Sequence, residues 1–355
     1  MIKILEVCNS DFTVNFIMKN YLMQLSKKNY EVHCSCDGQQ IDKELLKNIF
    51  FHNISIPRSF NIFLFLFKIL YFIYFIRKYD FDFVNSTNRN SSFILRISVF
   101  LLNLFQKKKI INCYTARGFY FHDNQSSFTY SLTVYVEKIL LKLTDYVLSQ
   151  SQQDLDLVVN KRYISKDRIF YIGNGIDVVK FQKKTINQND LDFDDIFFNN
   201  HSKIICICSR IVSGKGLNDL MTSFLRLKDK GYDIKLLIIG DEISQVMHPY
   251  KKELLKIINN SIYNKDIKIT GITDKPNLYF NLCHIFVHPS YREGMPRSLL
   301  EAMSSQLIVI ASSIRGSKEI IDNGIDGFLY KVKDVDELTK SIEYVLKLNT
   351  EQIEL

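Results

Sequence analysis

The sequence predicts an α/β protein made of two doubly wound domains that face each other across a cleft. Its 355 residues are enough for two domains of ordinary size, and a chain with 46% hydrophobic and 24% charged residues is typically globular. Continuous apolar, β-branched runs alternate with helical patterns, which favours parallel strands covered on both faces. Ligands of such sheets bind at the carboxyl ends of the strands, so facing sheets would share one binding region.

The first domain is expected at residues 1–180, and its strands are predicted from six apolar segments. In chain order these are IKILEV, YEVHCSC, FDFVNS, KKIINCYT, DYVLSQ and RIFYIG. Residues 181–202 are rich in Asn and Asp and have no sustained period, which predicts a linker.

The second domain is expected at residues 203–355. Its predicted strands are KIICICS, IKLLIIGD, IKITG, HIFVHPS and LIVIAS, and the helical segments between them are GLNDLMTSFLRLKDKG, YKKELLKIINNS and PNLYFNLC. This alternation is typical of βαβ units, which build a parallel sheet.

Two segments of the first domain are unusually rich in aromatic and aliphatic residues. FNIFLFLFKILYFIYFI, from Phe60 to Ile76, has Lys68 near its middle. A central Lys costs about 2.5–3.5 kcal/mol in a membrane span, so spanning is disfavoured. Together with SSFILRISVFLLNLFQKKK, which carries Arg96 and Lys107–Lys109, it predicts a surface that lies against anionic headgroups. Burial of both helices, or an interface with a partner protein, remains an alternative.

Charge and cysteine content limit the partners and the compartment. The formal net charge of +8 favours an anionic partner, but there is no long Lys/Arg tract, so nucleic acid is not expected. The seven cysteines form no C-x-x-C pair, which argues against a metal site and favours reduced, buried thiols. MIKILEVCNS is predicted to be a strand without a cleavable signal, so we expect a cytoplasmic protein, peripheral on the inner face of the cell membrane.

Polar residues follow the carboxyl ends of four strands of the second domain, so we expect them at one edge of its sheet. They are Arg210 and Lys215 after the first strand, Gly240 and Asp241 at the second, Gly271 at the third and the REGMP segment after the fourth. Arginine forks onto phosphate oxygens and lysine supplies a compact charge. Two such cations can neutralise a diphosphate leaving group without a metal ion; a solvated loop pair is the alternative.

The segment YREGMPRSLLEAM, residues 291–303, predicts an anion-binding helix start. Pro296 fits the first helical position, and Arg297 begins a run of helix formers. The amides of Gly294, Met295 and the first turn then face outward together, which suits phosphate. The alternative is an ordinary amphipathic helix.

Two carboxylates flank this helix start. Glu301 lies about two turns into the predicted helix, where it could accept hydrogen bonds from a ribose diol. Glu293 lies in the loop before the helix and could bind hydroxyls of the sugar being moved. Capping of backbone amides is the alternative role for Glu293.

Taken together, these segments resemble the C-terminal domain of retaining glycosyltransferases of family 4, which have the GT-B fold of two Rossmann-like domains. The matching segments are SR…KG, IIGD, ITG, HPSYREGMPRSLLEAM and RGSKEII…GIDGFLY, and Glu293 and Glu301 meet the Glu-x7-Glu signature. EKILLKLTDYVLSQSQQD and IGNGID of the first half are also similar to segments of these enzymes. The RSLLEAM and RGSKEI forms are typical of the branch that builds capsule, O-antigen or protein-linked glycans on a lipid carrier.

The resemblance implies a transferase that moves a hexose or N-acetylhexosamine from a nucleotide sugar, a UDP-sugar first of all, to a polyprenyl-diphosphate-linked oligosaccharide. By analogy the first domain binds the acceptor and the second binds the nucleotide sugar. Arg210 and Lys215 then bind the diphosphate, and the amides after Glu293 bind the distal phosphate. Glu301 then binds the ribose and Glu293 the donor sugar. The anomeric configuration would be retained, with neither a divalent metal nor another cofactor.

The chain departs from the family pattern at two places. EVCNSDFTVNF lacks the Gly-Gly loop of many relatives, and TARGFYF carries Arg117 where the branch usually has histidine. Arginine cannot act as a base at neutral pH, so Arg117 is expected to steady a pyrophosphate or carboxylate at the catalytic centre, with His122 as a possible substitute base. The departures keep one alternative open, a catalytically impaired nucleotide-sugar-binding subunit of another glycosyltransferase. A dehydrogenase is excluded because no G-x-G-x-x-G follows an early strand.

Overall fold

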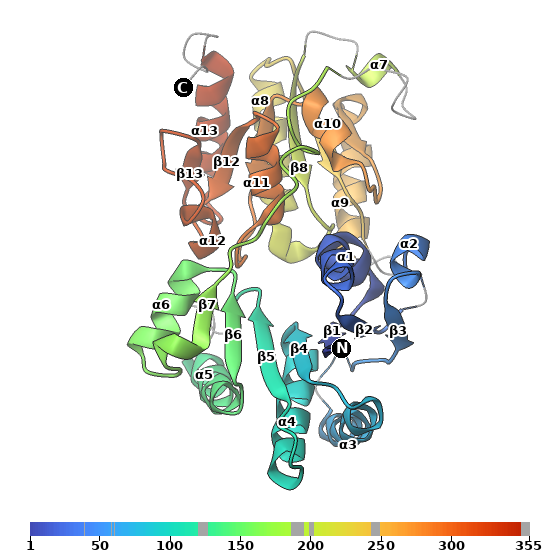
Figure 1. Cartoon of the computed structure of the whole chain (residues 1–355). Coiled ribbons are helices and arrows are strands. Elements are labelled where there is room, and N and C mark those ends of the chain that lie inside the picture. Colours follow the sequence, from blue (N-terminus) through green and yellow to red (C-terminus); the bar gives the residue numbers. More distant parts are fainter. Residues whose placement is uncertain are drawn as a thin grey trace. The chain divides into compact units, whose positions relative to one another are not determined.

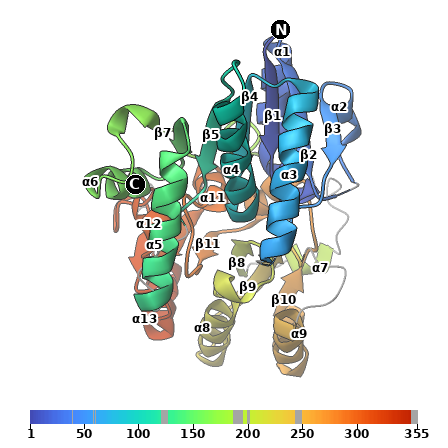
Figure 2. The same ribbon diagram turned by 90° about the horizontal axis from the view of Figure 1, so that it is seen from below.

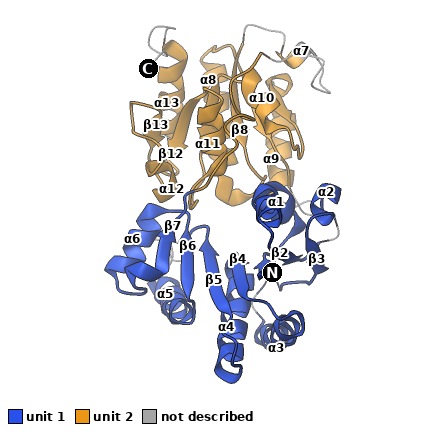
Figure 3. Cartoon of the chain, viewed as in Figure 1, with its two compact units in different colours: residues 1–173 blue, residues 174–355 orange. Residues whose placement is uncertain are grey.

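The protein forms two compact units, each with its own sheet. The computed structural model describes residues 1–38, 40–57, 59, 61–119, 127–185, 195–198, 202–242 and 249–348 (Figure 1). The chain divides between Gly173 and Asn174, ahead of the predicted boundary at 180 (Figure 3). Phe181 and Phe197, which the sequence places in a linker, pack in the core of the second unit.

The first unit is built on a seven-stranded parallel sheet in the order β3-β2-β1-β4-β5-β6-β7. Its strands are β1 (Lys3–Val7), β2 (Glu31–Cys36), β3 (Phe50–Asn53), β4 (Phe83–Thr87), β5 (Ile111–Ala116), β6 (Tyr146–Ser149) and β7 (Ile169–Tyr171). All six predicted strands are present. The unpredicted β3 is a short edge strand with both ends exposed, so it has no continuous apolar run.

Helices cover both faces of this sheet. They are η1, a π-helical segment (Thr13–Met18), α1 (Lys19–Lys27), α2 (Lys43–Leu46), α3 (Ile62–Tyr79), α4 (Arg89–Phe105), α5 (Ser127–Lys142), α6 (Gln152–Asn160) and the 3₁₀ turn η2 (Lys166–Arg168). The strand order runs from β1 to β3 in one direction and from β4 to β7 in the other. Right-handed crossovers therefore put α1 and α2 on one face and α3 to α6 on the other. Figure 2 shows α3, α4 and α5 side by side on that second face, where α4 contacts both neighbours.

The second unit repeats this architecture with a six-stranded parallel sheet in the order β10-β9-β8-β11-β12-β13. Its strands are β8 (Lys203–Cys208), β9 (Ile234–Ile239), β10 (Ile267–Ile269), β11 (Ile285–His288), β12 (Ile308–Ser312) and β13 (Phe328–Tyr330). Its helices are α7 (Asp195–Phe198), η4 (Ser213–Lys215), α8 (Leu217–Asp229), α9 (Pro249–Asn260), η5 (Asn264–Asp266), α10 (Pro276–Leu282), α11 (Arg297–Ser304), α12 (Arg315–Lys318) and α13 (Val335–Lys347). The five predicted strands correspond to β8–β12.

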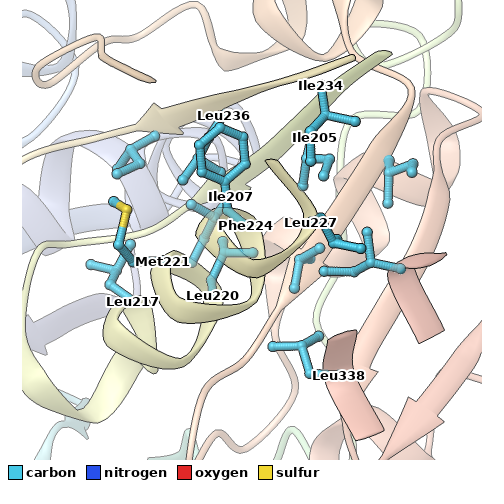
Figure 4. Packing of buried hydrophobic residues seen from close by; sticks show 14 of the residues in the cluster. Ile205, Ile207, Leu217, Leu220, Met221, Phe224, Leu227, Ile234, Leu236 and Leu338 are labelled. Carbon is cyan, nitrogen blue, oxygen red and sulfur yellow. The ribbon is translucent and has the colours of Figure 1, made fainter. Parts of the chain in front are cut away.

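The helix α8 shows how sequence periodicity builds this core. Its apolar side chains recur three or four positions apart and are buried at Leu217, Leu220, Phe224 and Leu227. They pack beneath β8 and β9, with Leu338 of α13 beside them (Figure 4). Burying a side chain of this size stabilises the fold by about 1.5–3 kcal/mol. The strands that carry the predicted site residues are thus held on a dense support.

The two aromatic segments of the first unit form α3 and α4, and they differ in burial. Most of the side chains along α4 from Ser91 to Leu102 are buried, so burial describes much of this helix. In α3 only one side is buried, and Phe63, Phe67 and Leu70 are exposed on the other. Within the described ranges, no helix has both the length and the apolar character needed to cross a membrane.

Candidate functional site

All predicted site residues except Arg117 lie in the second unit. Most are in the loops that follow the carboxyl ends of β8 to β11, whereas Arg297 and Glu301 lie on α11, the helix that follows the β11 loop. Because β10, β9, β8 and β11 are neighbours in that order, their carboxyl ends share one edge of the sheet. The side chains predicted to act together are thus brought to one edge by topology, although they are far apart in sequence.

The structure pairs Lys215 with Glu293. The Nζ atom of Lys215 forms an ion pair with Oε1 of Glu293. Two backbone contacts bring their loops together: the Tyr291 amide donates to the Gly214 carbonyl oxygen at 3.0 Å, and Gly216 packs against the carbonyl of Pro289. A Cβ at Gly216 would collide with that carbonyl, and its φ of +68° also favours glycine.

The charges around Glu293 keep it ionised. Burial would raise the pKa of this carboxyl, but the positive charge of Lys215, with a further contribution from Arg210, outweighs burial and lowers it. The side chains of Lys215 and Glu293 keep 20% and 23% of their exposure, so solvent still reaches both. Arg210 is exposed. Glu293 therefore lies within reach of the positive charges of Lys215 and Arg210.

The helix start after Glu293 forms one residue later than predicted. Pro296 has an extended ψ of 107° and is the N-cap of α11, which begins at Arg297. The Pro296 carbonyl accepts hydrogen bonds from the amides of Leu299 and Leu300, as an N-cap carbonyl does. Placing Pro296 at the first helical position was therefore wrong.

The backbone before α11 is held from two sides. The carbonyl oxygen of Met295 accepts a hydrogen bond from Nδ2 of Asn174 at 2.9 Å. Gly316 packs so closely on the carbonyl oxygen of Gly294 that any side chain there would collide with it. These contacts hold the peptide groups between Glu293 and Arg297 in fixed positions, and a site that binds an anion through backbone amides needs such rigidity.

Glu301 lies on the buried side of α11 and is paired. Its Oε1 accepts a hydrogen bond from Nε of Arg297 at 2.8 Å. Burial raises the pKa of Glu301, while Arg297 and Lys180 act in the opposite direction. Its other oxygen, Oε2, is not used in this hydrogen bond.

The ends of β9 and β10 place Gly240, Asp241 and Gly271 beside the β8 loop. Gly240 and Gly271 form a bridge between the strand ends, with φ values of +125° and +77°. The Gly240 amide donates to Oγ1 of Thr270 at 3.2 Å, and Asp241 forms an ion pair with Lys251. The carbonyl oxygen of Asp241 also accepts a hydrogen bond from the amide of Ile211, which connects this strand end to the loop that carries Arg210.

Beneath the site lies His288, which sequence reasoning missed. It is the last residue of β11, it is buried, and neither ring nitrogen has a hydrogen-bond partner among the described residues. Burial lowers its pKa to about 4, so the ring is neutral at pH 7. A histidine at the end of an apolar strand is a weak signal, because such a residue is more often part of the core.

In the first unit, Arg117 follows β5 and lies near a buried carboxyl that was also missed. Glu6 of β1 accepts hydrogen bonds from the Tyr21 hydroxyl at 2.7 Å and from Asn85 Nδ2 at 2.9 Å. Burial raises the pKa of Glu6 to about 7, while these hydrogen bonds and the charge of Arg117 act against burial. A signal existed, since Glu6 is a single acid in the apolar strand IKILEV.

Three further predictions concern the Gly-Gly loop, His122 and a metal site. The segment that lacks a Gly-Gly loop leads into the π-helical η1, and π-helical turns are frequent at functional sites. His122 lies outside the described residues. Within the described part of the chain, no cluster of three or more His, Cys, Asp or Glu residues could hold a metal ion.

Comparisons with known proteins find related sequences over most of the chain. Residues 3–151 match the family model described as glycosyl transferase 4-like, and residues 188–354 match that of glycosyl transferases group 1. The capsular polysaccharide biosynthesis glycosyltransferase CapM of Staphylococcus aureus is 26% identical over 335 residues, which cover 93% of this chain and 84% of CapM. An Escherichia coli protein named UDP-Gal:alpha-D-GlcNAc-diphosphoundecaprenol alpha-1,3-galactosyltransferase is 24% identical over 82% of this chain and 71% of its own.

Solved structures show the same fold. A glycosyltransferase from Rickettsia africae has a TM-score of 0.76 at 24% identity, with 99% of this chain and 90% of that one covered. Anabaena Alr3699/HepE, solved in complex with UDP and glucose, has a TM-score of 0.76 at 17% identity over 99% of this chain and 92% of its own. The two family models together span most of the sequence. The chain therefore belongs to the glycosyltransferases of GT-B fold, with a 4-like first unit and a group 1 second unit.

Proposed function

We propose that the protein is a retaining, metal-independent glycosyltransferase that extends a polyprenyl-diphosphate-linked oligosaccharide in capsule or O-antigen synthesis. The donor is a nucleotide sugar, with UDP as the nucleotide and a hexose or N-acetylhexosamine as the sugar. CapM, whose name gives capsular polysaccharide biosynthesis, and the E. coli protein, whose name gives UDP-Gal and a diphosphoundecaprenol-linked sugar, support this assignment. The protein would work from the cytoplasm, peripherally at the inner face of the membrane where a lipid-linked acceptor lies.

The observation that carries the proposal is the Lys215–Glu293 pair beside the start of α11. A diphosphate needs positive charge and amide donors, which Lys215, Arg210 and the backbone from Gly294 to Arg297 would supply. Glu293 would then bind hydroxyls of the donor sugar. Within their ion pair, the charges of Lys215 and Glu293 neutralise each other.

The remaining site residues have supporting roles in this scheme. Glu301, oriented by Arg297, would accept the ribose hydroxyls. Gly240, Asp241 and Gly271 would shape the wall of the nucleotide site. In the first unit, Arg117 would hold a phosphate or carboxylate of the acceptor.

Negative charge grows on the departing diphosphate during the reaction. Preorganised cations and amides stabilise this charge more strongly in the transition state than in the ground state.

The chemical step would proceed on one face of the sugar. The acceptor hydroxyl forms the new bond to the anomeric carbon as the bond to the diphosphate oxygen breaks. The hydroxyl proton passes to the leaving phosphate oxygen, so no protein base is required and the configuration is retained.

The test is a transfer assay with labelled UDP-, GDP- and ADP-sugars and a membrane extract that contains lipid-linked acceptors, with the anomeric configuration of the product read by NMR. We expect transfer from a UDP-sugar, retention, and no loss in EDTA. Lys215→Ala should lower transfer at least about 100-fold, as removal of a group that stabilises transition-state charge does. UDP binding without transfer from any donor would instead support the impaired partner subunit, for which Arg117 in place of histidine is the supporting observation.

A further inference from the structure

The outer helix layer of the first unit carries apolar side chains that the described residues leave exposed. On α3 the side chains of Phe63, Phe67, Leu70 and Tyr74 are exposed, and Phe63 keeps 79% of its exposure. Their spacing of four, three and four residues puts them on one side of the helix. Three residues further on, the same side ends in the exposed cation Arg77.

The helix α5 repeats this stripe at the same spacing. Phe128, Leu132, Tyr135 and Ile139 are exposed, with Phe128 at 79%, and the stripe ends in the exposed Lys142. This stripe lies outside the two aromatic segments from which a membrane-facing surface was predicted. Its polar neighbours Thr129 and Thr133 weaken the sequence signal.

The helix α4, between the other two, carries the pattern a third time. Phe93 and Ile97 are partly buried against the hydrophobic core that α3 and α4 share, while Phe100 and Leu104 are exposed. Lys107 follows at the same spacing, just beyond the last turn of α4, and is exposed. Three consecutive helices thus share one arrangement of four apolar residues followed by a cation.

These stripes form one surface because the helices lie side by side and run in the same direction. Figure 2 shows the three helices side by side, and α4 contacts both of its neighbours. Each helix leads into a strand that is parallel to the others, so the chain leaves each helix toward the amino ends of the strands. The three terminal cations therefore lie along one border of the apolar surface. We call the apolar residues with these cations the three-helix surface.

Charge decides which partner fits. The helices α3, α4 and α5 contain seven basic residues and a single carboxylate, Glu137, which is buried in an ion pair with Arg96. An apolar area with aromatic residues and a cationic border suits the interface of a bilayer with anionic headgroups. A second copy of the chain would set the same cations against each other or against its own apolar area, which favours it less.

We propose that the three-helix surface docks the protein on anionic lipid bilayers, with the stripes of α3, α4 and α5 acting as one contact area. The proposal rests on the proposed function only in that a lipid-linked acceptor gives the docking its purpose. The α5 stripe extends the contact area beyond the two aromatic segments of the sequence.

Cosedimentation with vesicles tests this, using phosphatidylglycerol mixed with phosphatidylcholine in one series and phosphatidylcholine alone in the other. Neither series contains acceptor or donor. The variants are Phe63→Ser with Phe67→Ser on α3, and Leu132→Ser with Tyr135→Ser on α5. The matched control is Ile262→Ser with Ile325→Ser, two residues of the second unit that keep 85% and 74% of their exposure. Circular dichroism melts check that all variants fold.

We expect the wild type and the control to bind the anionic vesicles, and the α3 and α5 pairs each to bind at least about tenfold more weakly. Changing Arg77, Lys107 and Lys142 together to Gln should weaken binding on the order of 100-fold and remove the preference for phosphatidylglycerol. Equal binding to both series, or an α5 pair that binds like the wild type, would overturn the proposal. So would a wild-type dimer that the α3 and α5 changes dissociate, because its occupant would be a second copy.

Failure of this proposal can be told from failure of the proposed function. Transfer to a detergent-solubilised acceptor does not need docking, so all surface variants should keep it. A wild-type protein that transfers sugar but does not bind vesicles would contradict only the proposed membrane docking. A wild-type protein that binds vesicles but transfers no sugar would contradict only the proposed glycosyltransferase function.

Discussion

Replacing Glu293 by Gln is expected to strengthen the binding of UDP while it abolishes sugar transfer. In the structure Glu293 holds the Nζ of Lys215, the cation that the diphosphate needs. Any diphosphate must therefore compete with a carboxylate of the protein. Gln keeps the size of the side chain but has no charge, so Lys215 becomes available while the surrounding packing is preserved.

The magnitude follows from the burial of the pair. Exposed ion pairs contribute about 0.2–1 kcal/mol, and breaking a fully buried pair costs about 3–5 kcal/mol. With side chains 20% and 23% exposed, this pair lies between these limits. Solvent screening puts it near the lower limit, at about 1–1.4 kcal/mol, which corresponds to a UDP dissociation constant about fivefold to tenfold lower in Glu293→Gln. Transfer should fall at least about 100-fold, because the contact to the donor sugar is lost.

Isothermal titration with UDP and the transfer assay measure the two effects. The gain in UDP affinity should disappear when Glu293→Gln is introduced into Lys215→Ala, because the cation that the change releases is absent. The matched control is Glu343→Gln, which breaks the ion pair with Lys230 between the end of α8 and α13 and should leave UDP binding unchanged. Unchanged or weaker UDP binding in Glu293→Gln, or the same gain without Lys215, would refute the reasoning.

Three further predictions concern the backbone, a buried carboxyl and the nucleotide. Gly216→Ala should destabilise the protein by about 1–3 kcal/mol in chemical denaturation, since its Cβ meets the Pro289 carbonyl at a φ of +68°, whereas Gly214→Ala, with open space around it, should not. The pKa of Glu6 is raised to about 7, so the carboxyl ionises at a lower pH in the unfolded state than in the folded state. The free energy of unfolding should therefore be highest below about pH 4.5 and fall by about 3 kcal/mol as the pH rises to about 7. Glu6→Gln should flatten this fall, and a stability profile like that of the wild type would contradict burial of Glu6 as its cause. Glu301→Ala should raise the donor KM about tenfold or more and remove discrimination against a 2′-deoxy donor; persisting discrimination would assign the ribose to another residue.

Much of the fold follows from local sequence signals. The strands β8, β9, β11 and β12 are mostly apolar, and α8 has an apolar period of three to four residues, so each of these elements is marked by its own residues. The edge strand β3 is different, because it is a strand only through its pairing with β2, where His33 lies opposite Phe50. Such pairing is a property of the folded chain and leaves little pattern in a short segment.

The site was predictable in part for a related reason. Parallel topology brings loop residues to one edge, so the neighbourhood of Arg210, Lys215 and Glu293 follows from the strand pattern. The ion pair of Lys215 with Glu293 joins residues 78 positions apart and carries no local signal. The pairing of Arg297 with Glu301 was available from the spacing of four residues on one helix. Burial, which shifts the pKa of Glu6 and His288, depends on the complete fold.

The buried ion pair of Arg96 and Glu137 gives the outer helices of the first unit a mechanical property. Nη1 of Arg96 on α4 lies 2.8 Å from Oε1 of Glu137 on α5, and the same guanidinium stacks over the Tyr114 ring of β5 at 4.2 Å. If α5 slid along α4, both charges would be left unpaired in the interior, at a cost of several kcal/mol. The ion pair therefore resists sliding of α5 along α4, and the Tyr114 contact holds α4 to the sheet. A force on one of these helices is passed to the others, so we expect them to move together as one rigid layer.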